Sequence, residues 1–176
     1  GYPAMQKALQ EMIRGKLTSI QRIRTSNDRL FSSDVVASVL QMDMEKIRIA
    51  IEEVDRQVFN RVVDKLIAAR HIYILGVRSS SFLAGYLHFY FHLIFENVTL
   101  VTSNSAGDIL ESILRIGPGD VLVGISFPRY SKATVKGVQF AHDRGADVVA
   151  VTDSDVSPLY PMASAVLLAR SDMISF

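Results

Sequence analysis

A chain of 176 residues, 49% of them hydrophobic, carries enough apolar material for a folded core, so a disordered chain is excluded. The chain has no cysteine, which rules out disulfides and thiolate-bound metals. The formal net charge of +1 is unevenly spread, because residues 1–30 carry six basic and two acidic side chains. Such a basic segment indicates either a neighbouring element that binds nucleic acid or a solvated helix surface.

No targeting or membrane segment is predicted. The N-terminus lacks a basic region followed by an apolar stretch, so it does not have the pattern of a signal peptide. The most apolar stretch, Phe82–Val101, contains two histidines, a glutamate and an asparagine, and is predicted to be a buried helix followed by a strand. We therefore expect a soluble, cytoplasmic protein that does not enter membranes.

The N-terminal part is predicted to begin with one helix and a linker. Pro3 stands where the helix would start, and apolar residues at helical spacing continue to about Gly15. Residues 18–33 carry few apolar groups and are predicted to be a linker or a loosely attached segment.

Further helical segments are predicted before residue 70. A short apolar face follows Asp34, and the next helix is expected to begin at Asp43 as its N-cap. A third helix, with Leu66 and Ile67 facing inward, is expected to run to Ala69.

Beyond this point the apolar pattern changes to short runs typical of buried strands, separated mostly by helical stretches. This alternation predicts βαβ units and a parallel sheet that is covered on both faces. We predict a three-layer α/β sandwich with the strand order 2-1-3-4-5, preceded by helices. Because no covering helix follows the fifth run, the domain is expected to be truncated at its C-terminal end. The runs are Ile72–Leu75, Asn97–Val101, Val121–Ile125, Val148–Val151 and Ala165–Leu168.

The first and third runs each end in a hydroxyl-rich loop that leads into a helix. A helix N-terminus presents unpaired N–H groups and the positive end of the helix dipole, and serine hydroxyls there complete an anion site. If the two strands are neighbours, both loops lie at the carboxyl edge of the sheet, where ligands bind. The alternative is that the serines cap helices and the arginines lie at the surface. The candidate ligand-binding residues are Arg78, Ser79, Ser80, Ser81, Ser126, Arg129, Tyr130 and Ser131.

Other polar residues carry weaker signals. His88 and His92 have the i, i+4 spacing of a metal pair, but no third ligand stands at a supporting spacing, so packing or interface residues are favoured and no metal or cofactor is predicted. Asp153 and Ser154 follow the fourth run and could contact a ligand, although the Ser-Pro-Leu sequence after them favours the start of a helix.

Three blocks of sequence carry a resemblance to a known family: GVRSSSFLA at Gly76–Ala84, GDVLVGISFPRYSKAT at Gly119–Thr134 and RGADVVAVTDSDVSPL at Arg144–Leu159. Over about residues 54–176 the chain resembles the flavodoxin-like sugar isomerase (SIS) domain, in particular the C-terminal sensor of RpiR/MurR-type transcriptional regulators.

The resemblance assigns roles to single residues in both loops. In the first, Ser80 stands at the phosphate-binding serine of a Gly-x-Gly-x-Ser loop, and Arg78 replaces its second glycine. In the second, the ends of the family's Ser-x-Ser-Gly-x-Thr pattern are matched by Ser126 and Ser131, while Pro128 and Arg129 replace the inner serine and glycine. This departure makes the contacts of the second loop less transferable from sugar-phosphate enzymes.

The resemblance also predicts a domain division. Residues 1–33 are similar to the end of a helix-turn-helix domain followed by a linker, and residues 34–176 would form the SIS effector-binding domain. The resemblance implies a homodimer that binds a sugar phosphate or a related phosphorylated metabolite between the two loops. DNA would be contacted only through a helix-turn-helix that lies upstream of this chain.

Two alternatives to a regulatory domain stay open. An aldose–ketose isomerase needs a general base, and neither loop contains a carboxylate or a histidine; Asp108 and Glu111, on the helix after the second strand, are the nearest candidates. The other alternative is a dimerisation module whose pocket no longer binds a ligand. We favour the effector-binding domain over both and expect no enzymatic activity.

Overall fold

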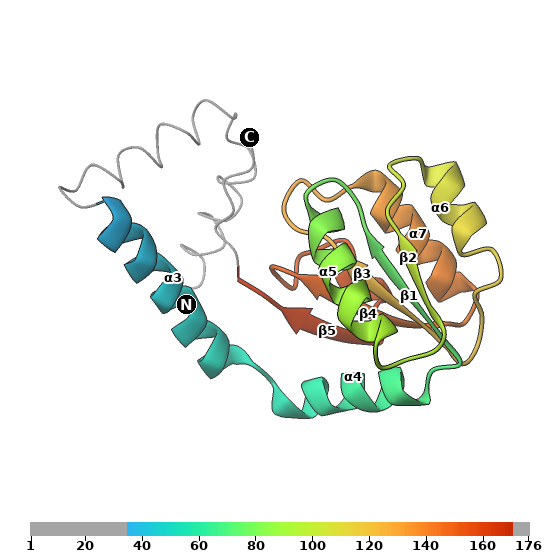
Figure 1. The fold of residues 1–176 in the computed structure, drawn as a ribbon, viewed down its shortest axis with the longest axis horizontal. Coiled ribbons are helices and arrows are strands. Elements are labelled where there is room, and N and C mark those ends of the chain that lie inside the picture. Colours follow the sequence, from blue (N-terminus) through green and yellow to red (C-terminus); the bar gives the residue numbers. More distant parts are fainter. Residues whose placement is uncertain (1–34, 171–176) are drawn as a thin grey trace. The chain divides into compact units, whose positions relative to one another are not determined.

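The computed structural model describes residues 35–170, and residues 50–170 form one compact unit. The helix predicted between Pro3 and Gly15, the linker predicted at 18–33 and the last six residues lie outside the described part. Figure 1 labels the α-helices and strands that follow. No helix in the described range is both long and apolar enough to cross a membrane.

The first described helix, α3 (Val35–Glu53), is continuous, so the predicted helix start at Asp43 is wrong. Residues 40–47 contain no glycine or proline, and nothing there interrupts the helical hydrogen bonds. Asp43 lies inside the helix, where its exposed carboxylate pairs with Lys46 at 3.5 Å. A side chain that can cap a helix is therefore tolerated within one when it is solvated and paired along the same face.

The next helix, α4 (Arg56–Ala68), begins at the N-cap Asp55, whose carboxylate accepts hydrogen bonds from the N–H groups of Gln57 at 2.8 Å and Val58 at 3.1 Å. Its buried residues are Val62 and Leu66. Ile67, which was expected to face inward, is 69% exposed, because it lies one residue beyond the narrow buried stripe. The helix predicted to end at Ala69 is otherwise confirmed.

Five parallel strands follow in the order β2-β1-β3-β4-β5, which confirms the predicted fold class. Every residue of the central strand β3 is buried, as expected when both faces of a parallel sheet are covered. The strand bounds are β1 (His71–Gly76), β2 (Val98–Val101), β3 (Asp120–Ile125), β4 (Asp147–Thr152) and β5 (Ala165–Leu168).

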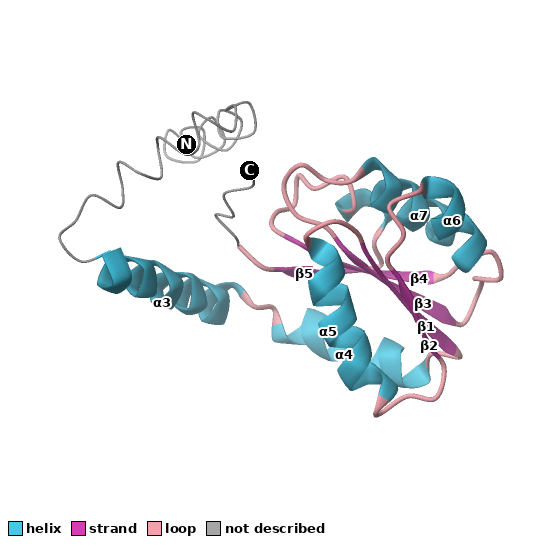
Figure 2. Ribbon diagram, turned by 45° about the horizontal axis from the view of Figure 1, so that its top comes forward, coloured by secondary structure: helices cyan, strands magenta, loops and turns pink. Residues whose placement is uncertain are grey.

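Helices cover the sheet on both sides. Figure 2 shows α4 and α5 (Ser80–His92) on one face and α6 (Ala106–Ser112) and α7 (Lys132–Asp143) on the other. Two separate apolar cores result, one beneath each pair of helices. Between β4 and β5 the chain forms only the short 3-10 helix η1 (Tyr160–Met162), rather than the helix start that the sequence favoured after Ser154.

An ion pair between the exposed Arg70 and the buried Asp120 joins the starts of the two central strands. Asp120, which is 1% exposed, accepts hydrogen bonds from Arg70 Nε at 2.9 Å, from Arg70 Nη2 at 2.8 Å and from the Gly117 N–H at 2.9 Å. Burial would raise the pKa of Asp120, but these hydrogen bonds outweigh it and hold the pKa below its usual value. The pairing stabilises the alignment of β1 with β3, and the opposite ends of these strands lead into the serine-rich loops.

Candidate functional site

The two serine-rich segments leave neighbouring strands at the same edge of the sheet. The last residue of β1, Gly76, is in register with Ile125, the last residue of β3. From β1 the chain runs outward to β2 and then returns to β3 on the other side, so β1 and β3 flank the switch point of the strand order. Ligands bind at this place in open parallel sheets. The predicted adjacency of the two strands is confirmed.

The first serine loop (Val77–Ser81) is a tight turn that continues into α5. At Gly76 a Cβ atom would stand 2.6 Å from the carbonyl oxygen of Ser80, so only glycine allows this close approach. The carbonyl of Arg78 accepts hydrogen bonds from the N–H of Ser81 at 3.1 Å and from its Oγ at 2.6 Å. Ser80 is only 7% exposed, whereas Ser79 and the Arg78 side chain are exposed.

The second serine loop (Ser126–Ser131) connects β3 to α7. Ser126 is 3% exposed, and its N–H donates to the carbonyl of Val151 on β4 at 3.1 Å. Tyr130 is partly buried, Arg129 is exposed, and Ser131 occupies the N-cap position of α7.

Helix capping does not engage the hydroxyls of Ser79 and Ser131. Ser79 and Ser131 stand at the N-cap positions of α5 and α7, yet neither side chain makes a capping hydrogen bond. By contrast, Ser105 at the start of α6 accepts a hydrogen bond from the Asp108 N–H. The hydroxyls of Ser79 and Ser131 are thus not committed to the helix termini that follow them.

Each serine loop contains one arginine in the left-handed region of backbone conformation. The φ angles are +57° at Arg78 and +68° at Arg129, and no other non-glycine residue in the described range has a positive φ. This conformation costs about 1 kcal/mol or more for a residue with a Cβ atom, and glycine avoids most of that cost. Each loop therefore carries an arginine where the backbone favours glycine.

Tyr130 ties the second loop to the segment after β4. Its hydroxyl donates to Asp153 Oδ1 at 2.7 Å. Burial, together with this hydrogen bond to a carboxylate, raises the pKa of Tyr130 to about 12. The hydroxyl proton is engaged within the protein, so Tyr130 can meet a ligand through its ring or as a hydrogen-bond acceptor. Sequence reasoning named both residues separately but did not pair them.

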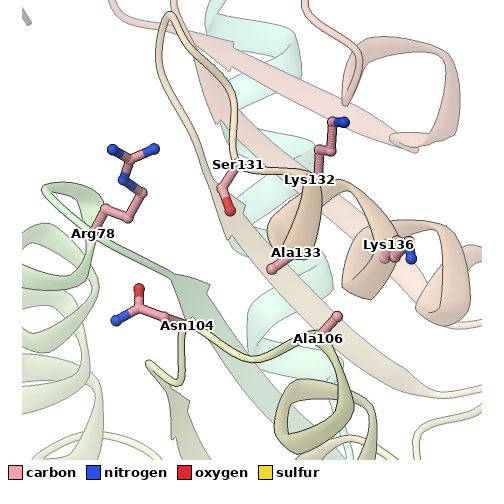
Figure 3. A pocket seen from close by; sticks show the side chains of 7 residues that line it. All are labelled: Arg78, Asn104, Ala106, Ser131, Lys132, Ala133 and Lys136. Atoms are coloured by element: carbon pink, nitrogen blue, oxygen red, sulfur yellow. The ribbon is translucent and has the colours of Figure 1, made fainter.

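A pocket of about 600 Å³ opens between the first loop, the start of α6 and the N-terminal part of α7 (Figure 3). Of the eight predicted ligand-binding residues, it brings together Arg78 and Ser131; the other six do not line it. Ser131 Oγ points into the space between α7 and the Arg78 side. The remaining lining residues are Asn104, Ala106, Lys132, Ala133 and Lys136.

Sequence reasoning missed the three polar lining residues Asn104, Lys132 and Lys136. Asn104 follows β2 at the same edge of the sheet, and the two lysines stand one turn apart at the start of α7. Asn104 could have been found from its position shortly after β2, the neighbour of β1, and the two lysines from their position at the start of the helix that follows the second serine loop. In the first turn of α7, Thr134 Oγ1 is the single buried side-chain polar atom without a hydrogen-bond partner between residues 35 and 170.

The weaker candidates take other roles. The rings of His88 and His92 stack with their centroids 5.7 Å apart, and no group of three potential metal ligands occurs in the described part of the chain. Asp108 accepts a hydrogen bond from Ser103 Oγ at 2.7 Å, and Glu111 is exposed. Neither carboxylate lines the pocket.

Proteins of known structure share this fold. The sugar isomerase domain of an RpiR transcription factor from Sphaerobacter thermophilus has 26% sequence identity and a TM-score of 0.71, over 76% of this chain and 74% of that one. The Vibrio vulnificus NanR protein, complexed with ManNAc-6P, shares the fold with 22% identity and a TM-score of 0.69, over 89% of this chain and 58% of that one.

A curated relative and a family comparison agree with the structures. An uncharacterised HTH-type transcriptional regulator of Clostridium perfringens is 23% identical over 149 residues, which make up 85% of this chain and 52% of the relative, so the chain spans about half of that protein's length. The SIS domain model matches residues 65–176. The chain therefore belongs to the SIS domain family.

Proposed function

We propose that this domain binds a sugar phosphate, or a related phosphorylated metabolite, between the two serine loops as the effector of a transcriptional regulator. The observation that carries the proposal is the convergence of both loops at one edge of the sheet, beside a pocket with hydroxyl and cationic side chains. Backbone amides at the starts of α5 and α7, the helix dipoles and the serine hydroxyls are suited to a dianionic phosphate.

We assign the residues of the two loops different roles in ligand binding according to how deeply they are buried. Ser80 and Ser126 are nearly buried and stand next to the strand ends, where they would hold the phosphate at the base of the site. Ser131, at the N-terminus of α7, would add a hydroxyl, while Ser79 and Ser81 would shape the first turn of α5. Arg78 and Arg129 would add charged donors, and Tyr130 a ring against the sugar. The sugar-phosphate complex of the NanR protein supports this choice of ligand class.

A regulatory role fits the relatives of this domain. Both the RpiR transcription factor and the Clostridium perfringens protein are named as regulators. We propose that residues 34–176 form the effector domain, that residues 1–33 belong to the end of a DNA-binding domain, and that the protein acts in the cytoplasm. Effector binding would change the equilibrium between two arrangements of the attached helix-turn-helix domains.

We further propose that the domain forms a homodimer through α5. This helix exposes large apolar side chains over much of its surface; Phe82 is 81% exposed and Tyr86 67%. An isolated patch of this kind is unfavourable in water and typical of an interface. Sedimentation of the 176-residue chain at micromolar concentration should give a dimer, and Phe82→Glu combined with Tyr86→Glu should give a monomer. A monomer before substitution would refute this part.

Binding is favoured over isomerisation by the chemistry of the lining residues. None of the seven residues lining the pocket in the described part of the chain is a carboxylate or a histidine, so no familiar general base stands against a bound sugar there. Formation of a ketose phosphate from an aldose phosphate by this chain, abolished by Glu111→Gln, would favour the isomerase instead.

The direct test is a thermal-shift screen with phosphorylated sugars, each paired with its unphosphorylated form. A ligand that binds only the native state stabilises it by RT ln(1 + [L]/Kd), about 2.7 kcal/mol at a concentration one hundred times Kd. We expect shifts that depend on the phosphate. Equal shifts from both members of every pair would overturn the proposal.

A further inference from the structure

The pocket beside the serine loops holds more positive charge than one phosphate requires. Arg78 from the first loop and Lys132 and Lys136 from α7 all line it. Within residues 35–170 none of these three side chains makes an ion pair or a hydrogen bond, and no acidic residue lines the pocket with them. Three unpaired cations around one cavity form a site for anions.

The amount of charge distinguishes one anionic group from two. A phosphate monoester carries about −1.5 to −2 at neutral pH, whereas the three side chains carry three positive charges. A bound monophosphate would leave about one positive charge uncompensated. A second acidic group on the same ligand would neutralise it.

The cations also lie on different sides of the cavity. Figure 3 shows Arg78 and Asn104 on one side and Lys132 and Lys136 across from them on α7, with Ser131 between. Such an arrangement suits a ligand that presents anionic groups in more than one direction. Asn104 can donate to an acidic oxygen or accept from a sugar hydroxyl.

The backbone at Arg78 adds an independent reason to assign that side chain to a ligand. Its φ of +57° would suit glycine, and its guanidinium makes no hydrogen bond or ion pair within residues 35–170 that offsets the strained conformation. An arginine kept in this conformation without a protein partner is explained if its partner is the ligand.

We infer that the effector carries two anionic groups: a phosphate held by the serine loops, and a second acidic group, either a carboxylate or another phosphate, held by Arg78, Lys132 and Lys136. This inference rests on the proposed function and names the chemical class of its ligand. The site would select sugar-acid phosphates or sugar bisphosphates over neutral sugar monophosphates.

The test measures the affinity of the 176-residue chain for two matched pairs of probes. Sorbitol 6-phosphate and 6-phosphogluconate differ only in the carboxylate at one end, and fructose 6-phosphate and fructose 1,6-bisphosphate differ in the second phosphate. We expect at least one acidic member to bind ten-fold or more tightly than its neutral counterpart. The pair that shows the preference identifies the second group as carboxylate or phosphate.

Two sets of variants locate the preference. Arg78→Gly suits the backbone and removes the guanidinium, so it should fold normally, and Lys132→Gln with Lys136→Gln removes the charges on α7. Each should reduce the preference to about three-fold or less, and the double lysine variant should change monophosphate affinity by less than about three-fold. Arg61→Gln, which removes an exposed charge from α4 on the opposite face of the sheet, is the control and should leave the preference unchanged.

The outcomes distinguish a failure of the second anionic subsite from a failure of the proposed function. If the monophosphates bind and neither acidic counterpart gains affinity, the second anionic subsite is refuted while the proposed function stands. If a preference exists but persists in both sets of variants, the subsite lies elsewhere and the inference is also refuted. If none of the four probes binds, and the phosphate-dependent shifts of the wider screen are absent too, the proposed function itself fails.

Discussion

The two serine loops begin at neighbouring strands and each contains a left-handed arginine, but they are held in place differently. The first is closed on itself by hydrogen bonds to the Arg78 carbonyl and by the close approach of Gly76 to Ser80. The second is held by the segment after β4, because the Tyr130 hydroxyl donates a hydrogen bond to Asp153 there. A self-contained turn is sensitive to changes within its own backbone, whereas a tethered loop is sensitive to loss of its partner.

The largest difference between the loops is expected at the glycines in front of them. Gly76→Ala should destabilise the domain by about 3 kcal/mol, because its Cβ would meet the Ser80 carbonyl at 2.6 Å and backbone cannot move aside easily. Gly124→Ala meets the side-chain atom Val138 Cγ2 at 2.8 Å, which can shift, and should cost about 1–2 kcal/mol. Urea denaturation of both variants measures the two values. Equal losses would contradict the proposed difference in rigidity.

The next effect concerns ligand affinity, where the two loops should behave alike. Ser80→Ala and Ser126→Ala should each weaken binding of a phosphorylated ligand by about 1.5–3 kcal/mol, since each removes a hydroxyl from a charged group. Calorimetric titration measures both, and thermal denaturation controls for folding. In the double variant the two losses should not add, because both hydroxyls contact one phosphate. Unchanged affinity in both single variants would place the phosphate elsewhere.

A smaller effect is expected when the hydrogen bond between Tyr130 and Asp153, which holds the second loop, is removed. Tyr130→Phe should lower the free energy of unfolding by about 1 kcal/mol through loss of the hydrogen bond to Asp153. The pKa of Tyr130 is raised in the folded state to about 12, so its contribution is fully present below the unfolded value of about 10 and is lost as the pH rises toward 12. Stability curves of the wild type and the variant should therefore converge above pH 10. A constant difference up to pH 12 would contradict this assignment.

The smallest effect isolates the backbone strain that the loops share. Arg78→Gly should stabilise the domain by about 0.5–1 kcal/mol relative to Arg78→Ala, because both lose the guanidinium but only alanine keeps the Cβ in the left-handed region. The same pair at Arg129 repeats the measurement in the second loop. Glycine variants no more stable than the alanine variants would show that the strain is relieved in solution.

The pattern of apolar residues along the sequence predicted the sheet, because its core strands are continuous apolar runs. The order 2-1-3-4-5 followed from the alternation with helices, and it brought the two loops to the same edge as expected. Predictions made from single residues failed where packing in the folded domain decides the outcome. Asp43 has the chemistry of an N-cap but lies inside α3, and Ile67 extends an apolar stripe that the sheet covers only as far as Leu66.

The site was only partly predictable for a related reason. Serines after a strand can be recognised one loop at a time, but the pocket also depends on residues from other elements. Asn104 joins it from the loop after β2, and Lys136 joins from the second turn of α7. The hydrogen bond between Tyr130 and Asp153 joins two different loops. The two residues are 23 positions apart in the sequence, and the periodicity of apolar residues cannot predict a contact over that separation.

The measurement that bears most directly on the central claim is a crystal structure of the chain with a sugar phosphate selected from the thermal-shift screen. We expect the phosphorus atom to lie between the two serine loops, with phosphate oxygens within hydrogen-bonding distance of the hydroxyls of Ser80, Ser126 and Ser131. A phosphate bound outside the space between β1 and β3, with these three hydroxyls uncontacted, would contradict it.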